Sequence, residues 1–317
     1  MNYRSIFFFL GIYSLLVSFF SALNILYSIY FDFTLGIKSY IATLLISLIV
    51  GSLLIFVGKD HKKNISTVDQ VFFIVLSFIL IPLLISIPYV LSIYDLSLID
   101  SYFESVSGFT TTGFSIIENI KNIDEPLILW RSSSQWLGGL IFLIATIGTI
   151  GSKQTKLKPA YLLSGGASGR NFYNNFNYNF VKILLIYFFL TVFVIILYSL
   201  INIRLLDTVN LALTTISSGG FLPTNSLSNI IESDLQIFIL SLTLLLPVFN
   251  LFLLHDVVTK QFSFRNYQED LHLALLIVLL TFFFYFFVIP NEGFSNVFFA
   301  IISSVSTSGI TTYSSNF

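Results

Sequence analysis

Long apolar stretches separated by short polar segments organise this chain. Seven of the stretches are long enough to cross a bilayer as a helix, which takes about 20 apolar residues. They lie near residues 6–30, 40–57, 71–93, 130–151, 181–203, 235–257 and 271–290. The pattern predicts an all-α, polytopic membrane protein surrounded by lipid.

The composition strengthens this prediction and excludes several other classes of protein. Of the 317 residues, 56% are hydrophobic and 10% are charged, whereas soluble proteins contain about 25% charged residues. The net charge of −1 offers no basic surface, so we expect no nucleic-acid partner. Because the chain has no cysteine, disulfides and thiolate-based sites are excluded. We expect no cofactor.

The distribution of positive charge predicts the orientation in the membrane. Most of the 15 Lys and Arg residues lie beside the N-terminus or in loops that the spans place on the same side. The side rich in Lys and Arg is normally the cytoplasmic side. We therefore expect a multi-pass protein of the cytoplasmic (inner) membrane, with its N-terminus in the cytoplasm.

Three short apolar segments follow spans in this series. Each lies on the side of the membrane opposite to the cytoplasm. They cover residues 100–109, 207–216 and 294–305, and each is helical in its pattern but too short to cross the membrane. Such a segment enters the membrane and returns through the residues that follow it. These are a first loop of Thr110, Thr111, Thr112 and Gly113; a second of Ser217, Ser218, Gly219 and Gly220; and a third of Ser306, Thr307, Ser308 and Gly309.

The three loops have the chemistry of an ion filter. Non-helical backbone persists at membrane depth only where it lines a cavity or packs on protein. Extended backbone and hydroxyl groups supply oxygens that replace the hydration shell of a cation, and the C-terminal end of each short helix adds partial negative charge. The loops contain no carboxylate, which favours a large monovalent cation over calcium or magnesium. Small residues also allow close helix packing, but these three clusters recur outside the full spans.

Several longer motifs resemble the TrkH/KtrB superfamily of potassium transporters, most of all its bacterial TrkH branch. They are FESVSGFTTTG at 103–113, WRSSSQWLGG at 130–139, SGGASG at 164–169 and TISSGGFLP at 215–223. The resemblance implies potassium-channel-like repeats of helix, pore helix, loop and helix around one ion path. It also implies potassium uptake, a homodimer and a cytosolic nucleotide-binding regulatory subunit. Potassium would be held by backbone oxygens at Thr111, Thr112, Ser218, Gly219, Thr307 and Ser308.

The resemblance also divides the chain into repeats. The chain departs from the family pattern in several places. We expect two N-terminal helices at 1–66, a first repeat at 67–178, a second at 179–268 and a partial third at 269–317. The family has four repeats, and this chain stops at Phe317, so we expect a truncated gene model, a fragment or one half of a split transporter. Gly219 stands where the other loops have a hydroxyl residue, which is expected to loosen the second loop. Ile310 replaces a more usual aromatic residue.

Other interpretations of the sequence stay open. The same loops suit a sodium-coupled or sodium-permeant transporter, because selectivity depends on fine filter geometry. A membrane-embedded lipid-modifying enzyme would use His255 and Asp256, although no paired His/acid motif recurs in the loops, and we expect no enzyme. Glu104 and Arg131 either form a buried pair behind the first loop or are two separately solvated charges.

Overall fold

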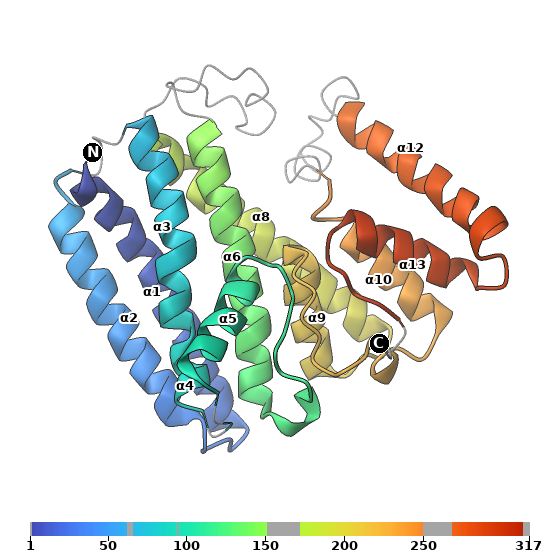
Figure 1. Cartoon of the computed structure of the whole chain (residues 1–317), viewed down its shortest axis with the longest axis horizontal. Helices are drawn as coiled ribbons and strands as arrows, with labels where there is room; N and C mark the ends of the chain where they lie inside the picture. The colour runs from blue at the N-terminus through green and yellow to red at the C-terminus, as the bar shows by residue number, and fades with distance from the viewer. Residues whose placement is uncertain are drawn as a thin grey trace.

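The computed structural model describes residues 2–61, 66–92, 94, 96–150, 172–249 and 268–312, and it is helical with no strand in these ranges. This confirms the predicted all-α class. The chain begins with a hairpin of two long helices, α1 (Tyr3–Tyr30) and α2 (Ile37–Gly58). Figure 1 shows this hairpin at one edge of the molecule and α12 at the other.

Small residues let the first two helices approach closely. A Cβ added to Gly11 of α1 would lie 2.7 Å from the carbonyl oxygen of Gly51 in α2. Van der Waals packing of this kind replaces the hydrophobic effect between helices in lipid. The sequence therefore fixes where α1 and α2 cross.

Three successive groups of helices follow, each with a long helix and then a short one. The first group contains α3 (Thr67–Ile85), α4 (Ile87–Val90), α5 (Leu98–Phe109), the short turn η1 (Ile120–Asn122) and α6 (Glu125–Ile150). The second contains α8 (Phe172–Leu200), α9 (Leu205–Ser217), η2 (Leu227–Asn229) and α10 (Asp234–Leu244). The third contains α12 (Gln268–Phe283), its π-helical continuation η4 (Phe284–Val288) and α13 (Phe294–Val305).

Six helices in the described part of the chain are long and apolar enough to cross a membrane. The sixth expected span, 235–257, is wrong as a continuous helix, because α10 ends at Leu244. Pro247 explains the break, since proline has no N–H and its ring clashes with the carbonyl four residues earlier. The N–H groups of Leu245 and Leu246 instead bond to carbonyls three residues back. Residues 250–257 lie outside the described ranges.

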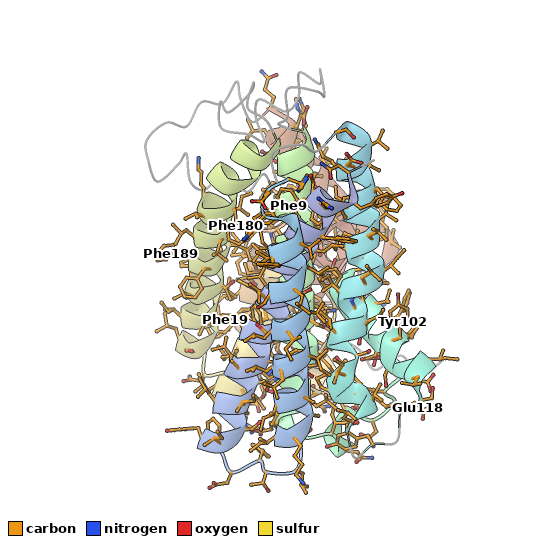
Figure 2. All side chains as sticks on the ribbon, turned by 90° about the vertical axis from the view of Figure 1, so that its left-hand side faces the viewer. Phe9, Phe19, Tyr102, Glu118, Phe180 and Phe189 are labelled. Atoms are coloured by element: carbon orange, nitrogen blue, oxygen red, sulfur yellow. The ribbon has the colours of Figure 1, made fainter. Side chains whose placement is uncertain are left out.

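The outer surface is apolar, as expected for helices in contact with lipid. Figure 2 shows side chains projecting outward from α1, α2 and α8. Phe19 on α1 is 56% exposed and Phe189 on α8 is 65% exposed, whereas Phe9 is buried between helices. Water-soluble proteins rarely expose apolar patches of this extent. This surface supports the membrane location.

Helix α6 lies at the centre of the molecule and contacts α1, α3, α5, α8 and α9. Its first half carries a cluster of buried polar side chains, including Arg131, Ser132 and Gln135. Buried polar groups are costly unless they are hydrogen-bonded. Their partners lie on the three loops and the short helices α5 and α9.

Candidate ion-conducting site

The three short helices end at the three loops in the same backbone conformation. In each loop the second and fourth residues have positive φ: 55° at Thr111 and 81° at Gly113, 54° at Ser218 and 82° at Gly220, and 58° at Thr307 and 64° at Gly309. The intervening Thr112, Gly219 and Ser308 do not. The loops are therefore not the extended backbone that the sequence predicted. The sequence did not reveal this, because hydroxyl-bearing residues seldom adopt positive φ.

Hydrogen bonds hold this alternating backbone against the end of each helix. The N–H groups of the second loop residues, Thr111, Ser218 and Thr307, donate to carbonyls three residues back at 2.9–3.2 Å. In the first loop the N–H groups of Thr112 and Gly113 also donate to one carbonyl, that of Ser107, at 2.9 and 3.5 Å. These backbone N–H groups therefore point back toward α5.

The loops meet one another edge to edge. A Cβ added to Gly113 would collide with the carbonyl oxygen of Gly219 and lie 3.2 Å from the Cα of Gly220. A Cβ added to Gly220 would collide with the carbonyl oxygen of Ser308. Segments that are far apart in the sequence thus form one continuous arc of glycines and carbonyls. At Gly309 no described residue lies within 4 Å of the Cβ position.

Each loop is tied to its short helix by one hydroxyl group that the sequence analysis missed. Ser107 donates to the carbonyl of Phe114 at 2.5 Å, Thr214 to that of Phe221 at 2.8 Å, and Ser303 to that of Ile310 at 2.6 Å. In every case the hydroxyl residue stands six positions before the last glycine of the loop. That spacing is present in all three repeats and was the signal available in the sequence.

We expect loss of one tether to impair ion discrimination. Ser107→Ala removes the donor to the carbonyl of Phe114, and the loss of such a hydrogen bond costs about 0.5–1.5 kcal/mol. The ratio of potassium to sodium uptake should fall several-fold. Ser105→Ala is the matched control, because the Ser105 hydroxyl, also in α5, bonds to the carbonyl of Ser101 in the same helix and not to the loop. Equal ratios for the two variants would contradict the role of the tether.

A buried ion pair stands behind the first loop, which decides between the two interpretations of Arg131 and Glu104. Nε of Arg131 donates to Oε1 of Glu104 at 2.9 Å, and the two side chains are 1% and 0% exposed. The carboxylate also accepts from the Ser115 hydroxyl at 3.0 Å and the Ile116 N–H at 3.1 Å. The pair therefore fastens the chain leaving the first loop to α5 and α6.

The same arginine also reaches the second loop. Its guanidinium lies 4.3 Å from the centre of the Phe221 ring, and one N–H group points at the carbonyl of Leu222 at 3.5 Å. Both residues follow Gly220 directly. A cation over an aromatic face is attracted to it most strongly when desolvated. Arg131 thus couples the first two loops.

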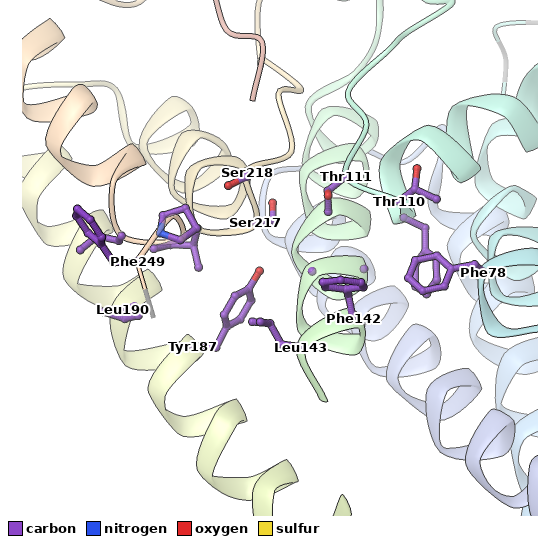
Figure 3. Close-up of a pocket in the computed structure, with 16 residues that line it drawn as sticks. Phe78, Thr110, Thr111, Phe142, Leu143, Tyr187, Leu190, Ser217, Ser218 and Phe249 are labelled. Carbon is purple, nitrogen blue, oxygen red and sulfur yellow. The ribbon is translucent and has the colours of Figure 1, made fainter. Parts of the chain in front are cut away.

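A cavity of about 300 Å³ lies at the ends of α5 and α9. Figure 3 shows Thr110, Thr111, Ser217 and Ser218 on one side, and Phe78, Phe142 and Tyr187 on the other. The hydroxyl group of Tyr187 is buried without a hydrogen-bond partner in the described part of the chain. Its ring packs on Trp136, with centroids 4.9 Å apart.

A larger space of about 1000 Å³ lies at the opposite end of α9, where Leu206 and Asp207 begin the helix. It is lined by Glu125, Asp207 and Glu232, with Arg204 paired to Glu125. Burial raises the pKa of the Asp207 carboxyl, and nearby Arg204 opposes that rise. An excess of acidic groups at an entrance concentrates cations. The loops thus lie between an acidic space and a mostly apolar one.

The described residues give little support to a catalytic interpretation of the sequence. No group of three or more His, Asp or Glu side chains able to hold a metal ion occurs there. His255 and Asp256, like the motif at 164–169, lie outside the described ranges.

Comparison with known proteins agrees with this geometry. Residues 36–250 match the family model of TrkH, described as a cation transport protein. An uncharacterized cation transporter of Methanocaldococcus jannaschii is 32% identical over 136 residues, which are 43% of this chain and 28% of that protein. The Trk system potassium uptake protein TrkH of Halomonas elongata is 25% identical over 299 residues, covering 86% of this chain and 59% of that protein.

A solved structure matches the fold over nearly the whole chain. The potassium transporter TrkH from Vibrio parahaemolyticus superimposes with a TM-score of 0.81 at 21% identity, over 99% of this chain and 66% of that one. The chain thus spans about three-fifths to two-thirds of the length of these two TrkH proteins. Since the family model covers more than half of its residues, the chain belongs to the TrkH family of cation transport proteins.

Proposed function

We propose that this chain forms part of the ion path of a potassium uptake system in the cytoplasmic membrane. The observation that carries the proposal is the arc in which Gly113 meets Gly219 and Gly220 meets Ser308. Backbone oxygens gathered around one axis replace the water lost by a cation on entry. The first residues of the loops, Thr110, Ser217 and Ser306, direct their hydroxyls to carbonyls of their own helices. Potassium would therefore bind mainly to backbone oxygens of residues 111–112, 218–219 and 307–308.

The surroundings of the loops support the same function. The C-terminal ends of α5 and α9 carry partial negative charge and lie beside the cavity that the loops line. The acidic space at the other end of α9 would collect cations before they enter. This arrangement favours entry of a cation from the acidic side.

Family membership and the charge distribution support a proposal for the partners and the orientation. We propose a homodimer, a cytosolic nucleotide-binding regulatory subunit and a cytoplasmic N-terminus. Potassium uptake proteins of the Trk system are among the matched relatives, which supports the choice of ion. Sodium-coupled or sodium-permeant transport is the second candidate, because the loops contain no group that alone discriminates the two ions.

Uptake by cells that lack other potassium transporters would test the function. We expect the full-length protein to restore growth at low potassium and to take up radioactive rubidium, with competition by potassium and little competition by sodium. Stronger competition by sodium would favour the second candidate. Uptake that survives Gly113→Asp but is lost with His255→Ala would instead favour an enzyme.

A further inference from the structure

We propose that Gln135 is a positioning residue that takes the place of the side chain missing at Gly219 and sets the selectivity of the second loop. The inference rests on the proposed function of the loops as an ion filter. It explains how a loop with one hydroxyl fewer keeps the same backbone conformation as the other two.

The third residue of each loop shows the difference. In the first loop the hydroxyl of Thr112 bonds to that of Thr110 at 2.7 Å, and in the third the hydroxyl of Ser308 bonds to that of Ser306 at 3.1 Å. These bonds link the first and third residues of the loop. Gly219 has no side chain to make the equivalent bond.

Gln135 supplies hydrogen bonds to the second loop from α6. Its Nε2 donates to the carbonyl of Gly219, and its Oε1 accepts from the Phe221 N–H at 3.2 Å. The Thr214 hydroxyl lies 2.8 Å from both Oε1 and the Phe221 carbonyl oxygen and shares its single proton between them. The side chain is 0% exposed. The amide group therefore bridges Gly219 and Phe221, the residues on either side of Gly220. It also contacts the Thr214 hydroxyl, which ties this loop to α9.

The glycine at 219 is needed for space and not for its conformation. Unlike Gly113, Gly220 and Gly309, it does not have positive φ, so its backbone does not require glycine. A Cβ at this position would collide with the amide group of Gln135. Gln135 and Gly219 are thus a complementary pair, in which a side chain from α6 fills the volume that the loop leaves empty.

Gln135 would affect the ion by fixing the direction of one carbonyl group, that of Gly219. The Gly219 oxygen lies against Gly113 and accepts from Gln135. A donor fixed by further hydrogen bonds holds this oxygen in place before the ion arrives, and such preorganisation separates ions of different size. Without the amide, the carbonyl gains freedom and the site discriminates less.

Reciprocal substitution in the full-length protein tests the pair. We expect Gln135→Ala to lower the ratio of potassium to sodium uptake about tenfold, and Gly219→Ser to lower it at least as much, since hydrogen-bond losses of this kind are worth about one decade. The double variant has room for the introduced serine, whose hydroxyl can bond to that of Ser217. It should recover to within about threefold of the wild-type ratio, because a compensating pair is non-additive. Losses that simply add, or an unchanged ratio in Gln135→Ala, would overturn the inference.

A second glutamine provides the matched control. Gln236 makes three hydrogen bonds, accepting from the N–H groups of Glu232 and Ser233 and donating to the carbonyl of Ile201, but it caps α10 away from the loops. Gln236→Ala should lower the unfolding temperature and leave the ion ratio unchanged. If the two glutamine variants change the ratio equally, Gln135 is structural only. A wild type that prefers sodium would refute the proposed ion, while the comparison among variants would still test the pair.

Discussion

Replacing Gly220 by alanine is expected to abolish potassium uptake. The residue has a φ of 82°, and a Cβ would collide with the carbonyl oxygen of Ser308 in the third loop. The backbone strain is about 1–2 kcal/mol, and overpacking adds about 1–3 kcal/mol. Because each 1.4 kcal/mol on a barrier is about tenfold in rate, rubidium uptake should fall roughly a hundredfold or more. Gly113→Ala should behave alike, since its Cβ would displace the carbonyl of Gly219.

Gly293 provides the control for this prediction. It begins the third short helix, α13, with a φ of −65°, and the nearest atom to an added Cβ is the Ser295 hydroxyl oxygen at 3.8 Å. Gly293→Ala should therefore transport normally. Wild-type uptake by Gly220→Ala, in protein that reaches the membrane, would show that the arc of loops is not the ion path.

Replacing Arg131 by methionine is expected to have the second largest effect. The substitution leaves Glu104 buried without its cation, which costs about 3–5 kcal/mol, and removes the contact with the Phe221 ring. Both the first and the second loop lose support. We expect a clearly lower unfolding temperature for the detergent-purified protein and little or no uptake. Glu104→Gln in the same chain should restore part of the stability, because it removes the unpaired charge.

A solvent-exposed Arg–Glu pair is the control for the contribution of burial to stability. Arg204 bonds to Glu125 at the surface, where its side chain is 65% exposed. Such pairs are worth about 1 kcal/mol or less, so Arg204→Met should change the unfolding temperature little. If Arg131→Met were equally mild, the buried pair would not be the element that holds the loops.

Much of the architecture could be predicted because the evidence for it is local. A long apolar run indicates a membrane-spanning helix, and a short helix followed by Thr or Ser and glycine indicates a re-entrant loop. Neither pattern depends on how the rest of the chain folds. The alignment of Gly113, Gly220 and Gly309 was visible for the same reason. The prediction of a continuous span at 235–257 is wrong because of another local feature, since Pro247 ends α10 early even though the surrounding sequence stays apolar.

The sequence by itself determined the helical class, the number of loops and the residues in them. The tertiary structure alone decided which loops touch, because Gly113 meets Gly219 only when two repeats pack side by side. It also decided that Glu104 and Arg131, 27 residues apart, share one buried site, and that Gln135 fills the space at Gly219 from 84 residues away. A side chain's own sequence neighbourhood cannot specify such partners, since burial and hydrogen bonding depend on the segments that folding brings together.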